Sequence, residues 1–294
     1  MATETIKAKL PLVVITGPTA SGKTSLAIRL AKQYNGEIVC ADSRTIYRDM
    51  DVGTAKPTRA EQEAVPHWGL DLVRPGEMFS VAQFKEYTLQ KISEIRSRGR
   101  LPFLVGGTGL YIDAVLFDFQ FGGPPSPIFR SELEKKTVTE LQYYCRIHNI
   151  KLPENDKNKR YLIRSIEQKN RYDRGKSVIK GNNIVVGIAT NKKTLRTRIV
   201  LRSEQLFSNN VVGEAMMLAQ KYGWDSEAMT GNVYPLVREF LNKNITEGEL
   251  KQRFITADWQ LAKRQVTWLR RNPFIVWTTL GSAEHYLSQL LAQA

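Results

Sequence analysis

Residues 17–24 read GPTASGKT, and this stretch constrains the chain more than any other. It fits the phosphate-binding pattern G-x-x-x-x-G-K-[ST]. A short apolar, β-rich run over residues 10–16 leads directly into it, and residues 25–34 follow with the apolar spacing of a helix. The pattern requires a strand before the loop and a helix after it, because the loop presents its amides at the helix N-terminus. The sequence therefore predicts a site for a di- or triphosphate.

The residue types of this loop suit phosphate binding. Gly17 and Gly22 allow the backbone to curl, so that amide N–H groups point at phosphate oxygens. Lys23 supplies a cation for the distal phosphate, and Thr24 offers a hydroxyl to Mg²⁺, which is the cofactor we expect. We predict that the whole loop binds the phosphate groups, through Gly17, Pro18, Thr19, Ala20, Ser21, Gly22, Lys23 and Thr24.

Strands and helices alternate along much of the chain. Besides residues 10–16, apolar runs typical of buried strands occupy residues 37–42, 101–107, 183–189 and 274–278. Residues 80–98 have helical spacing, and residues 192–270 are largely helical and basic. This alternation predicts an α/β fold, in which a parallel sheet like that of P-loop NTPases is flanked by helices.

Residues 117–181 break the alternation. A loop rich in Gly and Pro is followed by polar, charged helical segments at 130–149 and 156–168. We therefore predict a catalytic core made of residues 1–116 and 182–294, interrupted by a small helical insertion with a basic face.

The charge balance points to a polyanionic partner. Lys and Arg number 43 against 29 Asp and Glu, a net charge of +14, and nucleic acid is the commonest partner of so basic a protein. Simple solubility is the alternative reading of this charge. No apolar run reaches the ~20 residues of a membrane span, and Cys40 and Cys145 have no metal or redox spacing. We expect a reduced, cytoplasmic, monomeric protein without a membrane segment.

Asp42 and Thr108 are expected to face the phosphate loop. The apolar run LPFLVGG ends without the magnesium-holding carboxylate typical of ATPases, whereas the strand over residues 37–42 closes on Asp42. Because the carboxyl ends of strands line the ligand crevice in an open α/β sheet, Asp42 and Thr108 should both reach it. The alternative for each is an N-cap of the following turn or helix. These features indicate transfer to or from a nucleic acid without choosing the group transferred.

Four segments follow the loop in a fixed order. They are DSRTIYRDMDVGTAKP (42–57), LVGGTGLYIDAVL (104–116), NDKNKRYLIRSIE (155–167) and QLAKRQVTWLRR (260–271). With GPTASGKT, this series resembles the tRNA dimethylallyltransferase family, also called tRNA isopentenyltransferases or IPP transferases. The resemblance implies transfer of a dimethylallyl group from dimethylallyl diphosphate to N6 of adenosine 37, beside the tRNA anticodon, with release of diphosphate.

The resemblance also implies roles for single residues. Asp42 takes the proton of the N6 amine, and Thr108 contacts the target nucleotide or the bridging oxygen of the donor. Lys23, the loop amides, Mg²⁺ on Thr24 and an arginine stabilise the leaving diphosphate. Arg198 and Arg202 match the family's R-I-x-x-R segment, and a solvated basic helix face is their alternative. The predicted catalytic residues are thus Asp42, Thr108 and Lys23.

An adenine stacked in the anticodon arm must be extruded before its N6 can react. Ser43, Arg44 and Thr45 follow the base and are placed to hold the extruded nucleotide, while other basic and aromatic residues grip the RNA. Trp268 has core packing as its alternative. The predicted tRNA-binding residues are Asp42, Ser43, Arg44, Thr45, Thr108, Arg130, Lys159, Arg160, Arg164, Lys263, Arg264, Gln265 and Trp268.

Three other functions remain open at this point. A small-molecule P-loop kinase would use Asp42 near its acceptor but would not need a charge of +14. An adenylate isopentenyltransferase would use the same donor on a free nucleotide, without tRNA-gripping helices. A nucleotide-gated RNA-binding switch should keep a magnesium-holding carboxylate on the LPFLVGG strand, which lacks one.

Overall fold

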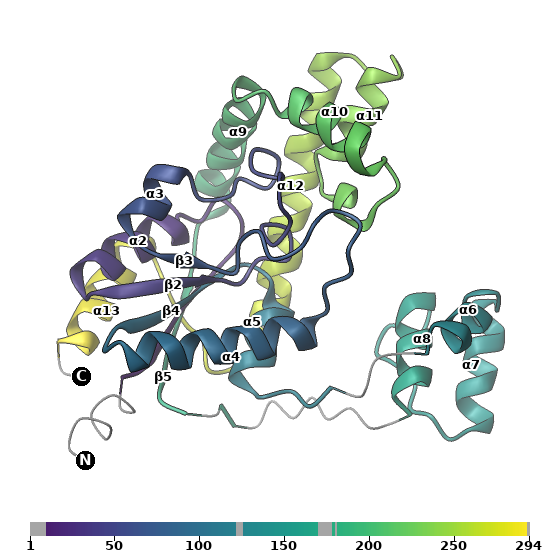
Figure 1. Cartoon of the computed structure of the whole chain (residues 1–294), viewed down its shortest axis with the longest axis horizontal. Helices are drawn as coiled ribbons and strands as arrows, with labels where there is room; N and C mark the ends of the chain where they lie inside the picture. Colours follow the sequence, from purple (N-terminus) through teal and green to yellow (C-terminus); the bar gives the residue numbers. More distant parts are fainter. Residues whose placement is uncertain (1–9, 122–125, 170–177, 180, 293–294) are drawn as a thin grey trace. The chain divides into compact units, whose positions relative to one another are not determined.

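The computed structural model describes residues 10–121, 126–169, 178–179 and 181–292 (Figure 1). The chain divides into two compact units, one made of Met1–Leu116 and Ile179–Ala294 and the other of Phe117–Val178. The first boundary coincides with the predicted one at residue 117, and the second lies three residues before the predicted end at 181. None of the helices in the described ranges is long and apolar enough to cross a bilayer.

The larger unit is built on a six-stranded sheet of order β3-β2-β4-β1-β5-β6, in which every pair is parallel. The central strand β1 (Leu12–Thr16) pairs with β4 (Leu101–Gly106) on one side and with β5 (Asn183–Ile188) on the other. Strand β2 (Gly36–Cys40) follows β4, and β6 (Val276–Thr278) pairs with β5. The predicted parallel α/β architecture is therefore confirmed.

Two details of the sheet differ from the sequence prediction. The edge strand β3 (His67–Trp68) has only two residues, too few for a periodic pattern to reveal it. Strand β2 ends at Cys40, so that Asp42 lies past the end of the strand.

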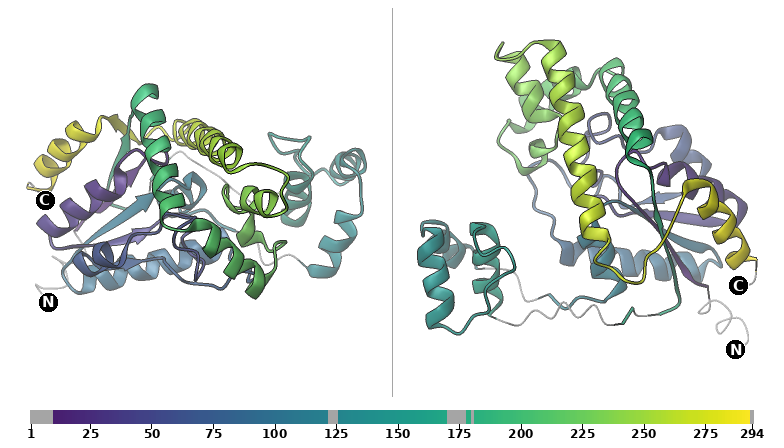
Figure 2. Two further views of the ribbon diagram at one scale, coloured as in Figure 1. Left: turned by 90° about the horizontal axis from the view of Figure 1, so that it is seen from above. Right: turned by 180° about the vertical axis from the view of Figure 1, so that it is seen from behind.

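Helices cover both faces of the sheet (Figure 2). On one face, α2 (Lys23–Gln33) and α13 (Leu280–Leu291) bury their apolar residues in one cluster with side chains of β1, β2, β4 and β5. On the other face lie α4 (Val81–Ser97), which buries Phe84, Ile92 and Ile95, and α5 (Gly109–Leu116), which is buried along almost its whole length. The short helix α3 (Arg59–Ala64) begins with a capping box at Thr58.

A group of helices stands beside the carboxyl ends of the strands. It comprises α9 (Lys192–Ser208), α10 (Val211–Tyr222), the 3₁₀ turn η1 (Glu227–Thr230), α11 (Tyr234–Leu241) and α12 (Glu247–Leu269). Their buried side chains form a second apolar core with Ile46, Tyr47 and Met50. Because this core ties the segment after β2 to the helices, it brings α9 and α12 over the phosphate loop.

The smaller unit consists of α6 (Pro127–Glu134), α7 (Val138–Ile147) and α8 (Lys159–Gln168). Leu133, Leu141 and Leu162 belong to its separate apolar core. The prediction of one helical segment over 130–149 is wrong, since two helices occupy this range. Thr137 forms a capping box with Glu140 and starts a new helix there, because its side chain accepts the N–H that the preceding helix would otherwise take.

Candidate active site

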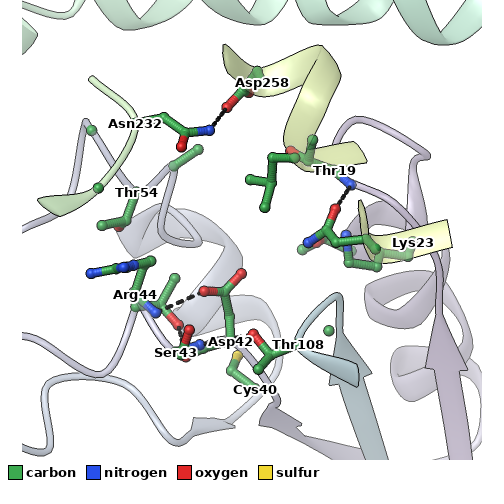
Figure 3. Close-up of a pocket in the computed structure, with 18 of the residues that line it drawn as sticks. Thr19, Lys23, Cys40, Asp42, Ser43, Arg44, Thr54, Thr108, Asn232 and Asp258 are labelled. Carbon is green, nitrogen blue, oxygen red and sulfur yellow. Dashed lines mark hydrogen bonds between the residues drawn. The ribbon is translucent and has the colours of Figure 1, made fainter. Parts of the chain in front are cut away.

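A cavity of about 380 Å³ opens at the carboxyl ends of β1, β2 and β4, where α2 begins (Figure 3). All of its walls belong to the larger unit. The ends of parallel strands in an open sheet are the usual place for a ligand crevice. Its polar lining residues include Thr19, Lys23, Thr24, Asp42, Ser43, Arg44, Thr45, Thr54, Thr108, Arg202, Asn232, Asp258, Arg264 and Gln265.

The phosphate loop has the backbone that its glycines predict. Gly17 and Gly22 have φ values of 148° and 90°, in the left-handed region that strains other residues. A Cβ on Gly22 would also come within 2.8 Å of Leu280 Cδ2. Gly22 thereby starts α2 with the helix N-terminus at the cavity. Of the eight loop residues predicted to bind phosphate, Thr19, Lys23 and Thr24 line the cavity itself.

Lys23 is a partly buried cation at the cavity. Its amino group donates a 3.1 Å hydrogen bond to the carbonyl of Pro18. Burial lowers the pKa of Lys23 to about 8; the nearby charge of Asp42 raises it and that of Arg202 lowers it further. A phosphate group in the cavity would replace the solvation that Lys23 lacks, so the site favours an anionic ligand.

Asp42 and Thr108 meet at the ends of neighbouring strands, as predicted from their positions (Figure 3). One carboxylate oxygen of Asp42, Oδ1, accepts a 2.8 Å hydrogen bond from the backbone N–H of Arg44. The hydroxyl of Thr108 accepts one of 3.1 Å from the N–H of Ser43. Asp42 therefore also caps the following turn, as the alternative predicted. Only Oδ1 takes part in this capping, and Asp42 still lines the cavity.

Cys40 is a further ionisable residue that lines the cavity, close to Asp42. Its thiol is buried, and burial followed by the charge of Asp42 raises the pKa to about 12. A thiol with this pKa stays neutral at physiological pH, so Cys40 does not compete with Asp42 as a base or nucleophile.

The two predicted arginines occupy different places. Arg198 donates a 2.9 Å hydrogen bond to the carbonyl of Ser21 and supports the phosphate loop from α9. Arg202, one turn later, lines the cavity, donates to the carbonyl of Thr54 at 3.4 Å and pairs with Asp258. Of these two arginines, only Arg202 therefore lines the cavity and can contact a ligand there.

Asn232 and Asp258 are among the polar residues of the cavity that the sequence did not predict. The side-chain amide of Asn232 donates a 2.9 Å hydrogen bond to Asp258, whose side chain is almost fully buried. A signal for Asp258 did exist, because it precedes Gln265 by seven residues, two helical turns, and so shares its helix face. Asn232 lies before α11 in a segment without periodicity and gave no such signal.

The predicted tRNA-binding residues of α12 have unlike environments. Lys263 and Arg264 are exposed, and Arg264 also lines the cavity. Gln265 lines the cavity but uses its carbonyl oxygen to accept the backbone N–H of Thr19 at 2.7 Å. The indole N–H of Trp268 donates to Asp113 at 2.9 Å, which favours the core-packing alternative, and its stacking on RNA stays a prediction. Its ring also lies where a Cβ on Gly109 would clash, so Trp268 packs α12 against α5.

The predicted basic residues of the insertion are engaged within their own unit. Arg130 pairs with Glu134 at 3.2 Å and with Glu167 at 3.5 Å, and Arg164 also pairs with Glu167. The amino group of Lys159 donates to the carbonyl of Glu134. These partners lower the free charge of the predicted basic face, and the contact of Arg130, Lys159, Arg160 and Arg164 with tRNA stays a prediction.

The side chains of the cavity could bind Mg²⁺ only together with oxygen atoms of a bound phosphate ligand. Within the described ranges, no three His, Cys, Asp or Glu side chains gather into a metal site. The hydroxyl of Thr24 lines the cavity, as predicted for a magnesium ligand. Mg²⁺ commonly keeps several waters and takes substrate phosphate oxygens rather than a full set of protein ligands. One hydroxyl beside a phosphate site is compatible with that mode of binding.

Comparison with known proteins decides the family. Residues 45–272 match the family model described as IPP transferase, and residues 10–72 match that described as isopentenyl transferase. The chain belongs to the IPP transferase family. The family resemblance noted in the five sequence segments is thereby confirmed.

Relatives of this chain align along nearly their whole length. The tRNA dimethylallyltransferase of Roseiflexus sp. (strain RS-1) is 38% identical over 286 residues, covering 91% of this chain and 92% of the relative. That of Bacillus anthracis is 34% identical over 291 residues, covering 93% and 92%. Family membership argues against the kinase and switch alternatives.

Solved structures share the fold. The full-length tRNA isopentenylpyrophosphate transferase of Bacillus halodurans has a TM-score of 0.74 at 32% identity, covering 97% of this chain and 98% of that one. A eukaryotic dimethylallyltransferase acting on tRNA has a TM-score of 0.77 at 20% identity, covering 93% and 75%. The second likeness supports the fold alone.

Proposed function

We propose that this protein transfers a dimethylallyl group from dimethylallyl diphosphate to N6 of adenosine 37 in tRNA and releases diphosphate. The observation that carries the proposal is that one cavity holds both the carboxylate of Asp42 and the phosphate-loop cation Lys23. The two are close enough for the charge of Asp42 to raise the pKa of Lys23. A base and an anion site side by side suit an acceptor amine that attacks a carbon bearing a diphosphate.

The reaction exchanges one bond for another. The N6 nitrogen forms a bond to the allylic carbon as the C–O bond to the diphosphate breaks, and the electron pair of that bond leaves with the diphosphate. The N6 amine is a weak nucleophile because its lone pair is delocalised into the ring, and Asp42 accepts its proton. Thr108, which lies beside Asp42, positions the reacting groups.

Charge on the leaving diphosphate is stabilised from the loop side of the cavity. Lys23 and Arg202 provide cations, and the N-terminus of α2 provides free amides. When bound at Thr24, Mg²⁺ would add positive charge to the diphosphate oxygens. Burial matters here because a cation acts more strongly in a site that excludes water.

The acceptor side of the cavity is polar and suits a nucleotide. Ser43, Arg44 and Thr45 line it after Asp42, and the guanidinium of Arg44 is held by the carbonyl of Glu227 at 3.1 Å. A base can enter only after extrusion from its stack, as in other enzymes that modify bases. Exposed Lys263 and Arg264 are suited to RNA phosphates, and we expect a monomer to act on the anticodon arm.

The test is transfer of labelled dimethylallyl diphosphate to unmodified tRNA or to AMP. We expect label on tRNA, at N6 of adenosine 37 after digestion. Label on AMP but not on tRNA would overturn the proposal in favour of an adenylate isopentenyltransferase.

A variant pair tests the base. Asp42→Ala should lower single-turnover transfer by about 10²–10⁴-fold, the usual worth of a general base. Asp225→Ala is the matched control, since that carboxylate is 91% exposed and pairs only with Arg238 among the described residues. Near-normal transfer by Asp42→Ala would refute the role of this residue.

A further inference from the structure

A buried carboxylate lines the cavity beside Arg202, where an anionic ligand would be expected to exclude one. The side chain of Asp258, on α12, is 4% exposed and lines the cavity. Burying a charge is costly unless a partner compensates for it, and removing one member of a buried pair is strongly destabilising. The presence of Asp258 therefore requires a purpose that offsets this cost.

Its charged partner is Arg202, which also lines the cavity. Arg202 Nε lies 3.5 Å from Asp258 Oδ2. Among the described residues, neither atom has a hydrogen-bond partner, so the attraction of the two charges dominates this contact. Asp258 thus attracts the Nε side of the guanidinium electrostatically, without forming a hydrogen bond to it.

Two further contacts complete the arrangement. The other carboxylate oxygen, Asp258 Oδ1, accepts the amide of Asn232 at 2.9 Å, which fixes the carboxylate through the oxygen that does not face Arg202 (Figure 3). Arg202 donates from a terminal nitrogen to the carbonyl of Thr54 at 3.4 Å. The guanidinium is therefore held from two elements far apart in sequence, and its 26% exposure leaves donors for a ligand.

We propose that Asp258 is a positioning residue for the diphosphate: it orients the Arg202 guanidinium toward the phosphate loop, and Asn232 orients Asp258. This inference rests on the proposed function, because it takes the loop side of the cavity as the diphosphate site. Asp258 does not itself touch the reacting atoms. Its contribution is to keep Arg202 in place before the donor binds, which lowers the entropic cost of forming the complex.

The proposal makes an unusual prediction about charge. If Asp258 acted only as a negative charge, replacing it with asparagine would strengthen the binding of an anion by removing repulsion. If it positions Arg202, the same replacement weakens binding. The new side-chain amide would offer Arg202 a donor where it needs an acceptor, while the remaining oxygen could still accept from Asn232. The sign of the change separates the two roles.

Binding of inorganic pyrophosphate, measured by calorimetry, tests this without requiring transfer. We expect Asp258→Asn to bind about tenfold more weakly than the wild type, and Arg202→Gln to bind more weakly still. In the Arg202→Gln background, Asp258→Asn should cause no further loss, because residues that act through one contact are not additive. Unchanged or tighter binding by Asp258→Asn, or an equal loss in both backgrounds, would overturn the proposal.

A second variant and a kinetic readout guard against a purely structural effect. Asn232→Ala keeps the charge of Asp258 but frees the carboxylate, and should give a smaller loss of pyrophosphate affinity in the same direction. Both variants should raise KM for the donor and lower kcat while leaving KM for tRNA within about twofold, when each is assayed well below its own thermal midpoint. Equal changes in both KM values would refute the positioning role. A wild type that binds no pyrophosphate would overturn the diphosphate site itself.

Discussion

The side-chain oxygen of Gln265 accepts a 2.7 Å hydrogen bond from the backbone N–H of Thr19, across 246 residues of sequence. This contact joins α12 to the phosphate loop, and Gln265 also fills the space beside Gly107, where an added Cβ would clash with its side-chain amide. Gln265, which was predicted to contact RNA, thereby holds the phosphate loop. The phosphate loop is consequently connected directly to the helix that carries the basic residues Lys263 and Arg264.

Removing this contact should weaken the donor site. We expect Gln265→Leu, which keeps the approximate volume but loses the hydrogen bond, to raise KM for dimethylallyl diphosphate about three- to tenfold, the worth of one hydrogen bond of ~1 kcal/mol. Gln265→Glu keeps the acceptor but adds a negative charge beside the loop, and should be worse. Steady-state kinetics in both substrates check this. An effect confined to tRNA would restore an RNA-contacting role for Gln265.

The lowered pKa of Lys23 predicts how anion binding depends on pH. Since its pKa is about 8, Lys23 is a cation below that pH and loses its proton above it. Pyrophosphate affinity of the wild type should therefore fall as pH rises from about 7 to about 9.5, by up to about tenfold per unit above the pKa. Arg202→Gln should move this limb to higher pH, because the charge of Arg202 lowers the pKa of Lys23.

Lys23→Arg is the control for the ligand's own titration. An arginine stays charged across this range, so its profile should be flatter than that of the wild type. Parallel profiles for the two proteins would mean that Lys23 does not titrate in this range.

Glu214 anchors the loop that carries Thr54 into the cavity. Its carboxylate accepts the backbone N–H groups of Asp51, Val52 and Gly53 at 2.7–2.8 Å and the hydroxyl of Tyr234 at 2.9 Å. Glu214→Ala leaves these donors without their acceptor and should lower the free energy of unfolding by about 2–3 kcal/mol in urea titrations.

Tyr234→Phe calibrates this effect, since it removes one of the four donors and should cost about 1 kcal/mol. The carboxylate of Glu214 would then still hold the loop. A loss for Glu214→Ala no larger than that for Tyr234→Phe would show that the backbone contacts to the loop contribute little.

The exposed cations of α12 should act through the RNA backbone. We expect Lys263→Ala with Arg264→Ala to weaken tRNA binding and to reduce the slope of log affinity against log salt by about 1 to 2, the effect of one or two lost phosphate contacts. Lys251→Ala with Arg253→Ala removes the same charge near the start of the helix, where each pairs with a glutamate, and serves as control. Equal effects of the two pairs would indicate a diffuse field rather than local contacts.

Much of this protein follows from local patterns in its sequence. The phosphate loop with its strand and helix is a contiguous motif, and a sequence of this pattern usually folds into the same strand–loop–helix structure. Asp42 could be placed because a residue past a buried strand must emerge at the sheet's carboxyl edge, whatever the rest of the fold does. The alternation of strands and helices likewise implied the parallel sheet.

Only the tertiary structure decided which polar side chains of the helices face the cavity. Arg198 and Arg202 are one turn apart on α9, yet one supports the loop backbone and the other lines the cavity. On α12, Gln265 turned out to hold the loop and Trp268 to pack against α5. Local sequence fixes the face on which a side chain lies, but its partner depends on the approach of elements distant in the chain. That approach is set by burial of the two apolar cores, which no single segment encodes.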